Sequence, residues 1–154
     1  MSYDVDIQRE VDNADLALPT DEDFQHWVSL ALTGRKPRGE ICIRLVAPTE
    51  SQQLNSDYRG KDSPTNVLSF PFEGPVGIPM DLLGDLAICA EIVSKEAQEQ
   101  NKPALNHWAH MVIHGTLHLI GFDHINEDEA EQMETLEVAL LASLNIPDPY
   151  QQGV

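Results

Sequence analysis

The sequence predicts an α/β (α+β) fold, in which a small mixed sheet of about four strands packs with about five helices around one buried helix. Strand-like and helix-like segments alternate through the first half of the chain, and three helical segments follow the last strand. Residues 104–120 are apolar on nearly every side, which is typical of a helix in the middle of a domain. The chain has 154 residues and no linker or repeat, so we expect residues 1–154 to form a single domain.

The first strand and the first helix are predicted by the spacing of their apolar residues. Residues 3–7 alternate apolar and acidic side chains, as in a half-buried strand. Thr20 with Asp23 three positions later is an N-cap pattern, and Gly34 marks the end of the helix that follows. The apolar positions of this helix recur at helical spacing and are Phe24, Trp27, Val28 and Ala31.

Turn residues divide the next part of the chain into short segments. These are a strand over residues 40–47, a short helix over 48–57, and strands over 66–72 and 84–90. The short helix opens at Pro48 and Thr49, with Gln52 as the capping partner of Thr49. Residues 73–80 contain two Gly and two Pro, which predicts a loop between the last two strands.

Three helices are predicted after the last strand. Residues 91–101 have a polar helical pattern, and Pro103 is well placed as the first residue of the central helix, which continues to Ile120. Asn126 with Glu129 caps the last helix. We expect its packing stripe at Met133, Leu136, Leu140 and Leu144.

The central helix carries histidines at a metal-binding spacing. His114 and His118 lie four residues apart, so their imidazoles project from one face. Gly121 is placed to end the helix in a left-handed conformation, which lets the chain return and bring His124 toward the same point. Three imidazoles with a vacant fourth position are typical of catalytic zinc, so we expect one Zn²⁺ per chain, with Ni²⁺ or another transition metal as an alternative. His110 could be a ligand in place of His124, it could orient the ligands without binding the metal, or it could belong to the core. The glycine turn favours His124 as the third ligand.

The same histidine spacing occurs in the metzincin metalloproteases. Their general base is the Glu that follows the first histidine, and this chain has Gly115 there. Peptide hydrolysis by that route would therefore lack its proton acceptor. The isolated His26 and His107 are interpreted as core residues instead.

The charge of the chain restricts how it could bind nucleic acid. A formal net charge of -17 argues against indiscriminate binding, because cation–phosphate contacts supply most non-specific affinity. Five of the nine Lys and Arg fall in residues 34–39 and 58–61. These two segments could form a local basic rim, or they could be solvated loop charges.

The remaining composition favours a cytoplasmic protein that is not embedded in a membrane. The first residues have no basic and apolar leader, and no apolar run is long enough to span a bilayer. Cys42 and Cys89 lie in strand-like segments without a nearby partner, so both are expected as reduced core residues.

Two segments resemble those of the YbeY family, bacterial metal-dependent endoribonucleases of ribosomal RNA maturation. One is HGTLHLIGFDH at residues 114–124, the other is YRGKDSPTNVLSFP at residues 58–71, and the resemblance extends over residues 54–144. It implies a small mixed sheet surrounded by helices and a zinc-dependent endoribonuclease specific for single-stranded RNA. It also implies a role in maturation of the 16S rRNA 3′ end and in ribosome quality control, with the small ribosomal subunit and assembly factors as partners.

The resemblance further implies that Arg59 is catalytic, and guanidinium suits that role because it is always charged and binds phosphate with two donors. The family often has Asp where this chain has Asn66. Asp85 and Asp123 could each orient a ligating imidazole or stand in a turn. Zinc would activate water and stabilise phosphate charge together with Arg59, while attack by a 2′-hydroxyl is equally compatible with the sequence.

Two other functions are compatible with the sequence. One is a metallopeptidase or amidase, which Gly115 disfavours. The other is a non-enzymatic ribosome-binding module whose metal is structural, with His110 as a fourth protein ligand.

Overall fold

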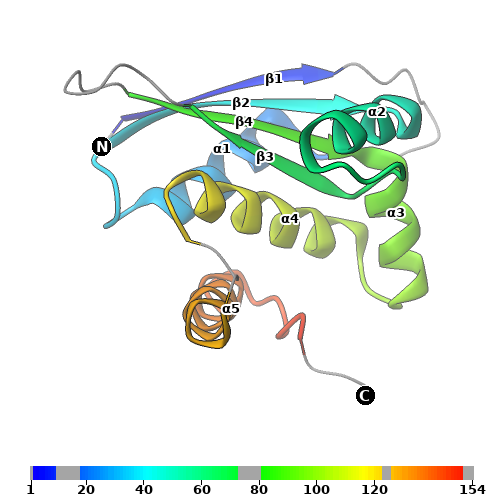
Figure 1. Cartoon of the computed structure of the whole chain (residues 1–154). Helices are drawn as coiled ribbons and strands as arrows, with labels where there is room; N and C mark the ends of the chain where they lie inside the picture. Colours follow the sequence, from blue (N-terminus) through cyan, green and yellow to red (C-terminus); the bar gives the residue numbers. More distant parts are fainter. Residues whose placement is uncertain (1, 10–17, 73–80, 123–125, 151–154) are drawn as a thin grey trace.

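The computed structural model describes residues 2–9, 18–72, 81–122 and 126–150. Nine elements follow one another in this part of the chain (Figure 1). They are β1 (Ser2–Arg9), α1 (Asp21–Leu32), β2 (Arg38–Val46), α2 (Pro48–Arg59), β3 (Val67–Pro71), β4 (Leu82–Cys89), α3 (Ala90–Glu99), α4 (Ala104–Leu119) and α5 (Glu127–Ala142). The predicted order of strands and helices is therefore confirmed.

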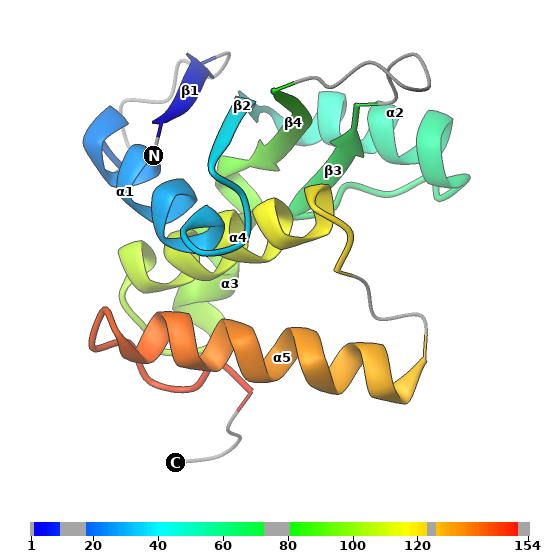
Figure 2. The same ribbon diagram turned by 90° about the vertical axis from the view of Figure 1, so that its left-hand side faces the viewer.

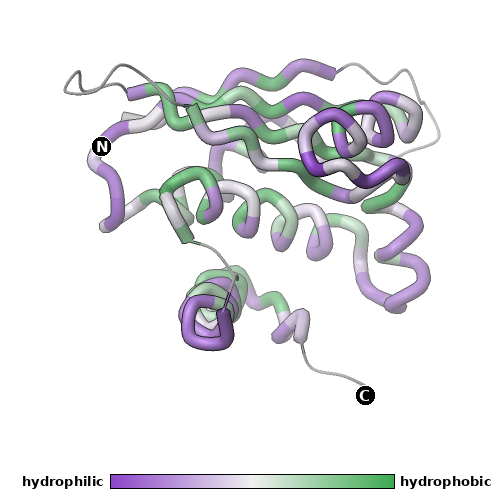
Figure 3. The backbone as a smooth tube through the Cα atoms, viewed as in Figure 1, coloured by the Kyte–Doolittle hydropathy of each residue, from purple (hydrophilic) through white to green (hydrophobic). Residues whose placement is uncertain are grey.

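The sheet is mixed, as the sequence predicts. Its strand order is β1-β2-β4-β3, with β1 and β4 both parallel to β2 and with β3 antiparallel to β4. The parallel pairs are joined through helices, while β3 forms one edge of the sheet. Hydrophobic and hydrophilic residues alternate along β1, which gives it one apolar side (Figure 3).

The core lies between the sheet and the helices α1 and α4. Ile41, Ile43 and Leu45 of β2 are fully or almost fully buried, and the two residues between them are half-buried. Phe24 of α1 meets Trp108 of α4 edge to face, with 5.8 Å between the ring centroids. Figures 1 and 2 show α5 on the far side of α4 from the sheet. Because α4 is covered from both sides, eleven of its sixteen residues are buried, as its all-round apolar pattern predicts.

Helix α2 begins at Pro48 as predicted, but its cap and its C-terminal end differ from the prediction. Its N-cap is Ala47 and Pro48 is its first residue, so the predicted cap by Thr49 is wrong. The helix also runs beyond residue 57 to Arg59, where Gly60 ends it in the left-handed conformation at φ 70°. Arg59 is thus the last residue of a helix, not part of a loop.

The last helix begins as predicted, but its buried stripe is shifted. The Asn126 side chain accepts a hydrogen bond from the Glu129 N–H and caps α5. The buried residues of α5 are Met133, Glu137 and Leu141, whereas Leu136, Leu140 and Leu144 are only partly buried. A glutamate therefore occupies the middle of the face that α5 turns toward the rest of the protein.

Several other sequence predictions can be compared with the structure. His107 is buried as expected, but His26 is exposed, so its assignment to the core is wrong. Cys89 is buried and Cys42 half-buried, and neither forms a disulfide. The predicted loop over residues 73–80 lies outside the described residues. None of the helices in the described ranges is both long enough and apolar enough to cross a membrane.

Candidate metal centre

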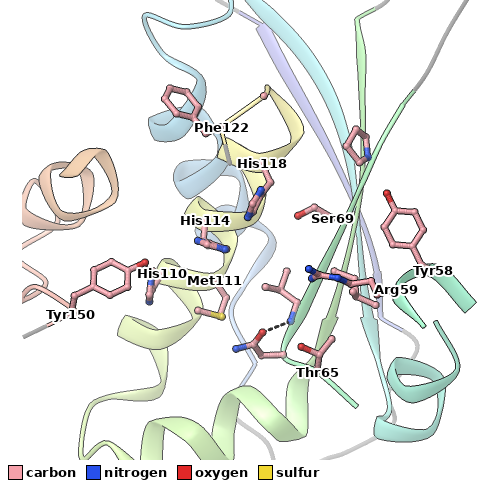
Figure 4. Close-up of a pocket in the computed structure, with 15 residues that line it drawn as sticks. Tyr58, Arg59, Thr65, Ser69, His110, Met111, His114, His118, Phe122 and Tyr150 are labelled. Carbon is pink, nitrogen blue, oxygen red and sulfur yellow. Dashed lines mark hydrogen bonds between the residues drawn. The ribbon is translucent and has the colours of Figure 1, made fainter. Parts of the chain in front are cut away.

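Three histidines of α4 lie in a row along one face of the helix. His110, His114 and His118 follow one another at intervals of four residues, so each lies one turn beyond the last. The ring centroids of His110 and His114 are 6.1 Å apart, and those of His114 and His118 are 4.6 Å apart. Figure 4 shows the three imidazoles along one wall of a cavity. The predicted stacking of His114 and His118 on one face is present.

The end of α4 has the geometry predicted from Gly121. This residue has φ 107°, and the following Phe122 N–H donates to the Leu117 carbonyl at 3.0 Å. The chain therefore reverses at Gly121 with the hydrogen bonds of a left-handed helix end. His124, the third predicted ligand, and Asp123 both lie outside the described residues.

Glu137 of α5 meets these histidines, and the sequence analysis did not identify it. Its side chain is fully buried, and Oε1 accepts a hydrogen bond from His114 Nδ1 at 2.6 Å. His110 Nε2 lies 3.3 Å from the same oxygen. The available signal was its position four residues after Met133 and four before Leu141, where a buried carboxylate interrupts an apolar stripe.

Tyr150 completes the cluster from the end of the described chain. Its hydroxyl donates to Glu137 Oε2 at 2.7 Å and lies 3.1 Å from His110 Nε2. Figure 4 shows that the hydroxyl is directed toward His110. Burial and the adjacent Glu137 carboxylate raise the pKa of Tyr150, so this hydroxyl remains a donor.

The electrostatics of the cluster favour an ionised glutamate beside neutral histidine. Burial opposes ionisation of Glu137, but hydrogen bonds from His110, His114 and Tyr150 outweigh it and hold the pKa of this carboxyl at about 2. Burial lowers the pKa of His110, although the Glu137 carboxylate acts in the opposite direction. Neutral imidazole is the form that binds metal ions.

The donor groups fit a transition-metal ion. The ligand atoms of His110, His114 and Glu137 all lie within 4.8 Å of one another, so these three residues could hold a metal ion. Two imidazoles and a carboxylate, or imidazoles alone, are donor sets found at zinc sites. His114 belongs both to this group and to the set predicted from sequence, which makes it the central residue of either arrangement.

The histidine row forms one wall of a cavity of about 720 Å³. The opposite wall carries Tyr58 and Arg59 from the end of α2 and Ser69 from β3 (Figure 4). Arg59 is exposed, and no described residue forms a hydrogen bond or ion pair with its guanidinium. The cavity therefore brings the predicted Arg59 opposite the predicted His114 and His118.

The rest of the predicted basic rim is not part of this cavity. Its lining includes Arg59 but not Lys61 or the cations at residues 35, 36 and 38. Arg38 lies 3.8 Å from the Asp81 carboxylate, an exposed ion pair that contributes little to stability. Among the described residues, Arg59 is thus the cation that lines the cavity.

Gly115 is explained by the packing of α4 on the sheet. A Cβ atom at this position would lie 2.8 Å from Leu86 Cδ2 and 3.4 Å from Val67 Cγ2. The helix can approach β3 and β4 this closely because Gly115 has no side chain, and Ser69 Oγ donates to the Gly115 carbonyl at 3.3 Å. A glutamate here would point into the sheet, so the general base of a metzincin has no room.

A second, partly buried hydrogen-bond network connects the two walls. Glu96 of α3 accepts hydrogen bonds from Asn66 Nδ2 at 3.1 Å and from His107 Nε2 at 2.8 Å. Asn66 Oδ1 in turn accepts from the Val67 N–H at 2.7 Å. The amide of Asn66 thus donates to a carboxylate, which an aspartate at this position could not do.

Asp85, one of the two residues considered as a support for the histidines, lies elsewhere. It is exposed, while the next residue of β4, Leu86, is buried against α4. Side chains alternate between the faces of a strand, so Asp85 points to the face away from the histidines. In the described part of the chain, Glu137 contacts His110 and His114 through its carboxylate.

Comparisons with known proteins agree with the fold and with the sequence segments. The family model described as "Endoribonuclease YbeY" matches residues 6–145. The solution structure of TM1509 from Thermotoga maritima is similar to this chain, with a TM-score of 0.58 and 25% sequence identity. The similarity covers 96% of this chain and 99% of the Thermotoga chain.

Proposed function

The chain belongs to the YbeY endoribonuclease family, and on that premise we propose that it is a metal-dependent endoribonuclease specific for single-stranded RNA. Its metal would be one Zn²⁺ held by His114, His118 and His124, with Arg59 as the catalytic cation. Its substrate would be ribosomal RNA at the 3′ end of 16S rRNA. It would act in the cytoplasm as a single domain, with the small ribosomal subunit and assembly factors as partners.

One observation carries this proposal. Arg59 and the pair His114 and His118 come from two segments about 55 residues apart in the sequence, and they line opposite walls of one cavity. Each segment independently resembles the family. Metal ligands on one wall, and on the other a guanidinium with no partner among the described residues, could stabilise the charge of a phosphodiester from two sides.

The residues that line the cavity would have separate roles in cleavage. A metal ion held at the histidine wall would supply Lewis-acid chemistry for a phosphodiester and for its attacking hydroxyl group. Arg59 would bind the non-bridging oxygens of the scissile phosphate with its two-pronged guanidinium. Tyr58 is 56% exposed beside Arg59, and an unstacked base could lie against its ring. Bases in a duplex are already stacked and paired, which favours a single strand.

The proposal also accounts for the acidic character of the chain. The net charge of -17 makes most of the surface repel RNA, so RNA should bind only where a cation is available. Arg59 lines the cavity and has no carboxylate partner among the described residues. RNA should therefore bind locally and with modest affinity, which suits an enzyme that must not degrade RNA generally.

The test is cleavage of a labelled single-stranded RNA by zinc-loaded protein. The same RNA annealed to its complement is the substrate control, and Arg59→Ala protein purified identically controls for contaminating nuclease. We expect the parental protein to cut the single strand much faster than the duplex. The 3′ ends of the products separate two routes, because only attack by the 2′-hydroxyl leaves a 2′,3′-cyclic phosphate. Intact RNA after incubation with metal-replete protein would refute the proposal.

A non-enzymatic, ribosome-binding role with a structural metal is the second candidate. It is favoured by the group formed by His110, His114 and Glu137, in which the protein itself could fill most of the coordination sphere. In that case the zinc-loaded protein would bind ribosomal RNA without cutting it, and Arg59→Ala would change binding alone. Peptidase activity has no comparable support, because Gly115 leaves no space for the required base.

A further inference from the structure

Glu137 is the buried charged residue at the centre of the contact between α5 and α4. Its side chain is fully buried, and it stands between the buried Met133 and Leu141 on one face of α5. A carboxylate is costly to bury unless it is well hydrogen-bonded. The burial of a carboxylate among the apolar residues of this face therefore points to a role beyond holding the helix in place.

The hydrogen bonds of Glu137 determine the state of His114. An ionised carboxylate can only accept, so His114 Nδ1, at 2.6 Å from Oε1, must carry the proton of this bond. The other oxygen accepts from the Tyr150 hydroxyl at 2.7 Å, which prevents the carboxylate from turning away. With Nδ1 protonated, a neutral His114 ring has its lone pair on Nε2.

We propose that Glu137 is a positioning residue that fixes the tautomer and orientation of His114, so that Nε2 is the atom presented to the metal. Tyr150 holds Glu137 in this role from the C-terminal segment. The inference rests on the proposed function only in requiring a metal at His114, and it does not depend on RNA cleavage.

The alternative is that Glu137 is itself a ligand beside His114. Two ligand atoms on one tetrahedral zinc ion, each at about 2.0–2.1 Å from it, are about 3.3 Å apart. The observed 2.6 Å between His114 Nδ1 and Glu137 Oε1 is shorter than that and is the length of a charge-assisted hydrogen bond. The geometry thus makes Glu137 the partner of a ligand and leaves coordination to Nε2 of His114.

The same arrangement assigns a function to the end of the described chain. Tyr150 is 40% exposed overall, yet its hydroxyl reaches Glu137. Tyr150 also lines both the large cavity and the smaller one between α4 and α5. Loss of this hydroxyl should loosen the carboxylate without removing it, which provides a graded test.

The decisive experiment measures Zn²⁺ affinity by competition with a chromophoric chelator. The variants are Glu137→Gln, Tyr150→Phe and Glu134→Gln, the last of which removes the same charge from an exposed position on the same helix. We expect Glu137→Gln to weaken zinc binding about 10- to 100-fold, as is typical when the partner of a ligating histidine is changed. Tyr150→Phe should weaken it by a smaller factor, and Glu134→Gln should leave it unchanged.

Two spectroscopic measurements separate positioning from coordination. In Co²⁺-loaded protein, the visible absorption bands should keep their positions in Glu137→Gln, because the ligand set is the same. In ¹⁵N-labelled metal-free protein, the His114 ring proton should reside on Nδ1. Parental zinc affinity in Glu137→Gln would overturn the proposal, and so would a changed Co²⁺ spectrum that signals loss of a carboxylate ligand.

The proposal remains testable if Glu137→Gln fails to fold, because the ring proton is observed in the parental protein. A His114 ring protonated on Nε2 in that protein would overturn it. None of these measurements uses RNA, so a failure of the endoribonuclease proposal would leave their outcome unaffected.

Discussion

One wall of the cavity holds its side chains through hydrogen bonds to a buried carboxylate, whereas Tyr58 and Arg59 on the other wall are exposed. On the α4 and α5 side, His114 donates to the fully buried Glu137, which also accepts from Tyr150. On the α2 and β3 side, Arg59 is exposed and has no partner among the described residues, and Tyr58 next to it is 56% exposed.

The difference shows which parts of the site are preorganised by the fold. Side chains that are hydrogen-bonded to a buried carboxylate are held in one arrangement, as a metal requires of its ligands. Exposed side chains at the end of a helix contribute little to stability and remain available for a ligand. Variants of the first wall should therefore change metal content, while variants of the second should change turnover and RNA affinity with the metal in place.

The largest effect is expected at the histidine wall. His114→Ala, His118→Ala and His124→Ala should each lower bound zinc from about one per chain toward zero, and RNA cleavage should fall to background. Zinc per chain is measured by atomic emission after gel filtration. His110→Ala is the comparison, and it should retain most of its metal. Full metal retention in His124→Ala, with loss in His110→Ala, would instead assign the third ligand to His110.

The next effect concerns Arg59 on the exposed wall. Arg59→Ala should reduce the cleavage rate about 10²- to 10³-fold, roughly 3 to 4 kcal/mol, because one electrostatic donor to the transition state is lost. Zinc content and melting temperature should not change, since no described residue pairs with this side chain.

Arg59→Lys tests the geometry of the same contact. Lysine restores the charge but not the paired donors, so it should recover only part of the rate. Cleavage at the parental rate by Arg59→Ala would show that Arg59 has no role in catalysis.

A smaller effect is expected at Tyr58. Its ring packs edge to face on Phe70 of β3, with centroids 4.6 Å apart, and it is exposed toward the cavity side. Stacking of one base on an aromatic residue contributes about 1–3 kcal/mol, so Tyr58→Ala should weaken single-stranded RNA binding roughly 5- to 150-fold. Tyr58→Phe keeps the ring and should bind normally. The measurement is fluorescence anisotropy with a short labelled RNA and zinc-free protein, where equal affinity for all three proteins would argue against stacking.

The sequence predicted the scaffold well because its signals are local. Alternation in residues 3–7, the cap at Asn126 and the left-handed Gly121 each depend on a few neighbouring residues, and all are present. Helix α2 is longer than the sequence predicts, because it continues past residue 57 to Arg59. Its end is fixed by Gly60, which the sequence analysis assigned to a loop.

The supports of the site could not be predicted from local patterns. Glu137 lies 23 residues beyond His114, and Tyr150 lies 13 beyond Glu137, so their contacts exist only after α5 has packed on α4. In the sequence, Glu137 is one acidic residue among many on an amphipathic helix. The role of Gly115 likewise depends on a contact that is distant in sequence, because a Cβ at this position would collide with Leu86 across the helix–sheet contact.

The smallest predicted effect concerns the link between the two walls, in which Glu96 accepts from Asn66 at the start of β3 and from His107 of α4. The hydrogen bond from His107 is the main reason why the pKa of Glu96 is lower than usual. A carboxyl with a depressed folded-state pKa stabilises the protein above its unfolded pKa of about 4.5, and this contribution is lost as pH falls through the lower folded value. Glu96→Gln should therefore have a lower free energy of unfolding than the parental protein at pH 7, by about 1 kcal/mol.

This difference in the free energy of unfolding should shrink below pH 4 in urea denaturation series, while zinc content at pH 7 stays unchanged. A constant difference across pH would show that Glu96 contributes through packing, and loss of zinc would show that the two walls depend on each other more closely than their separate hydrogen-bond networks indicate.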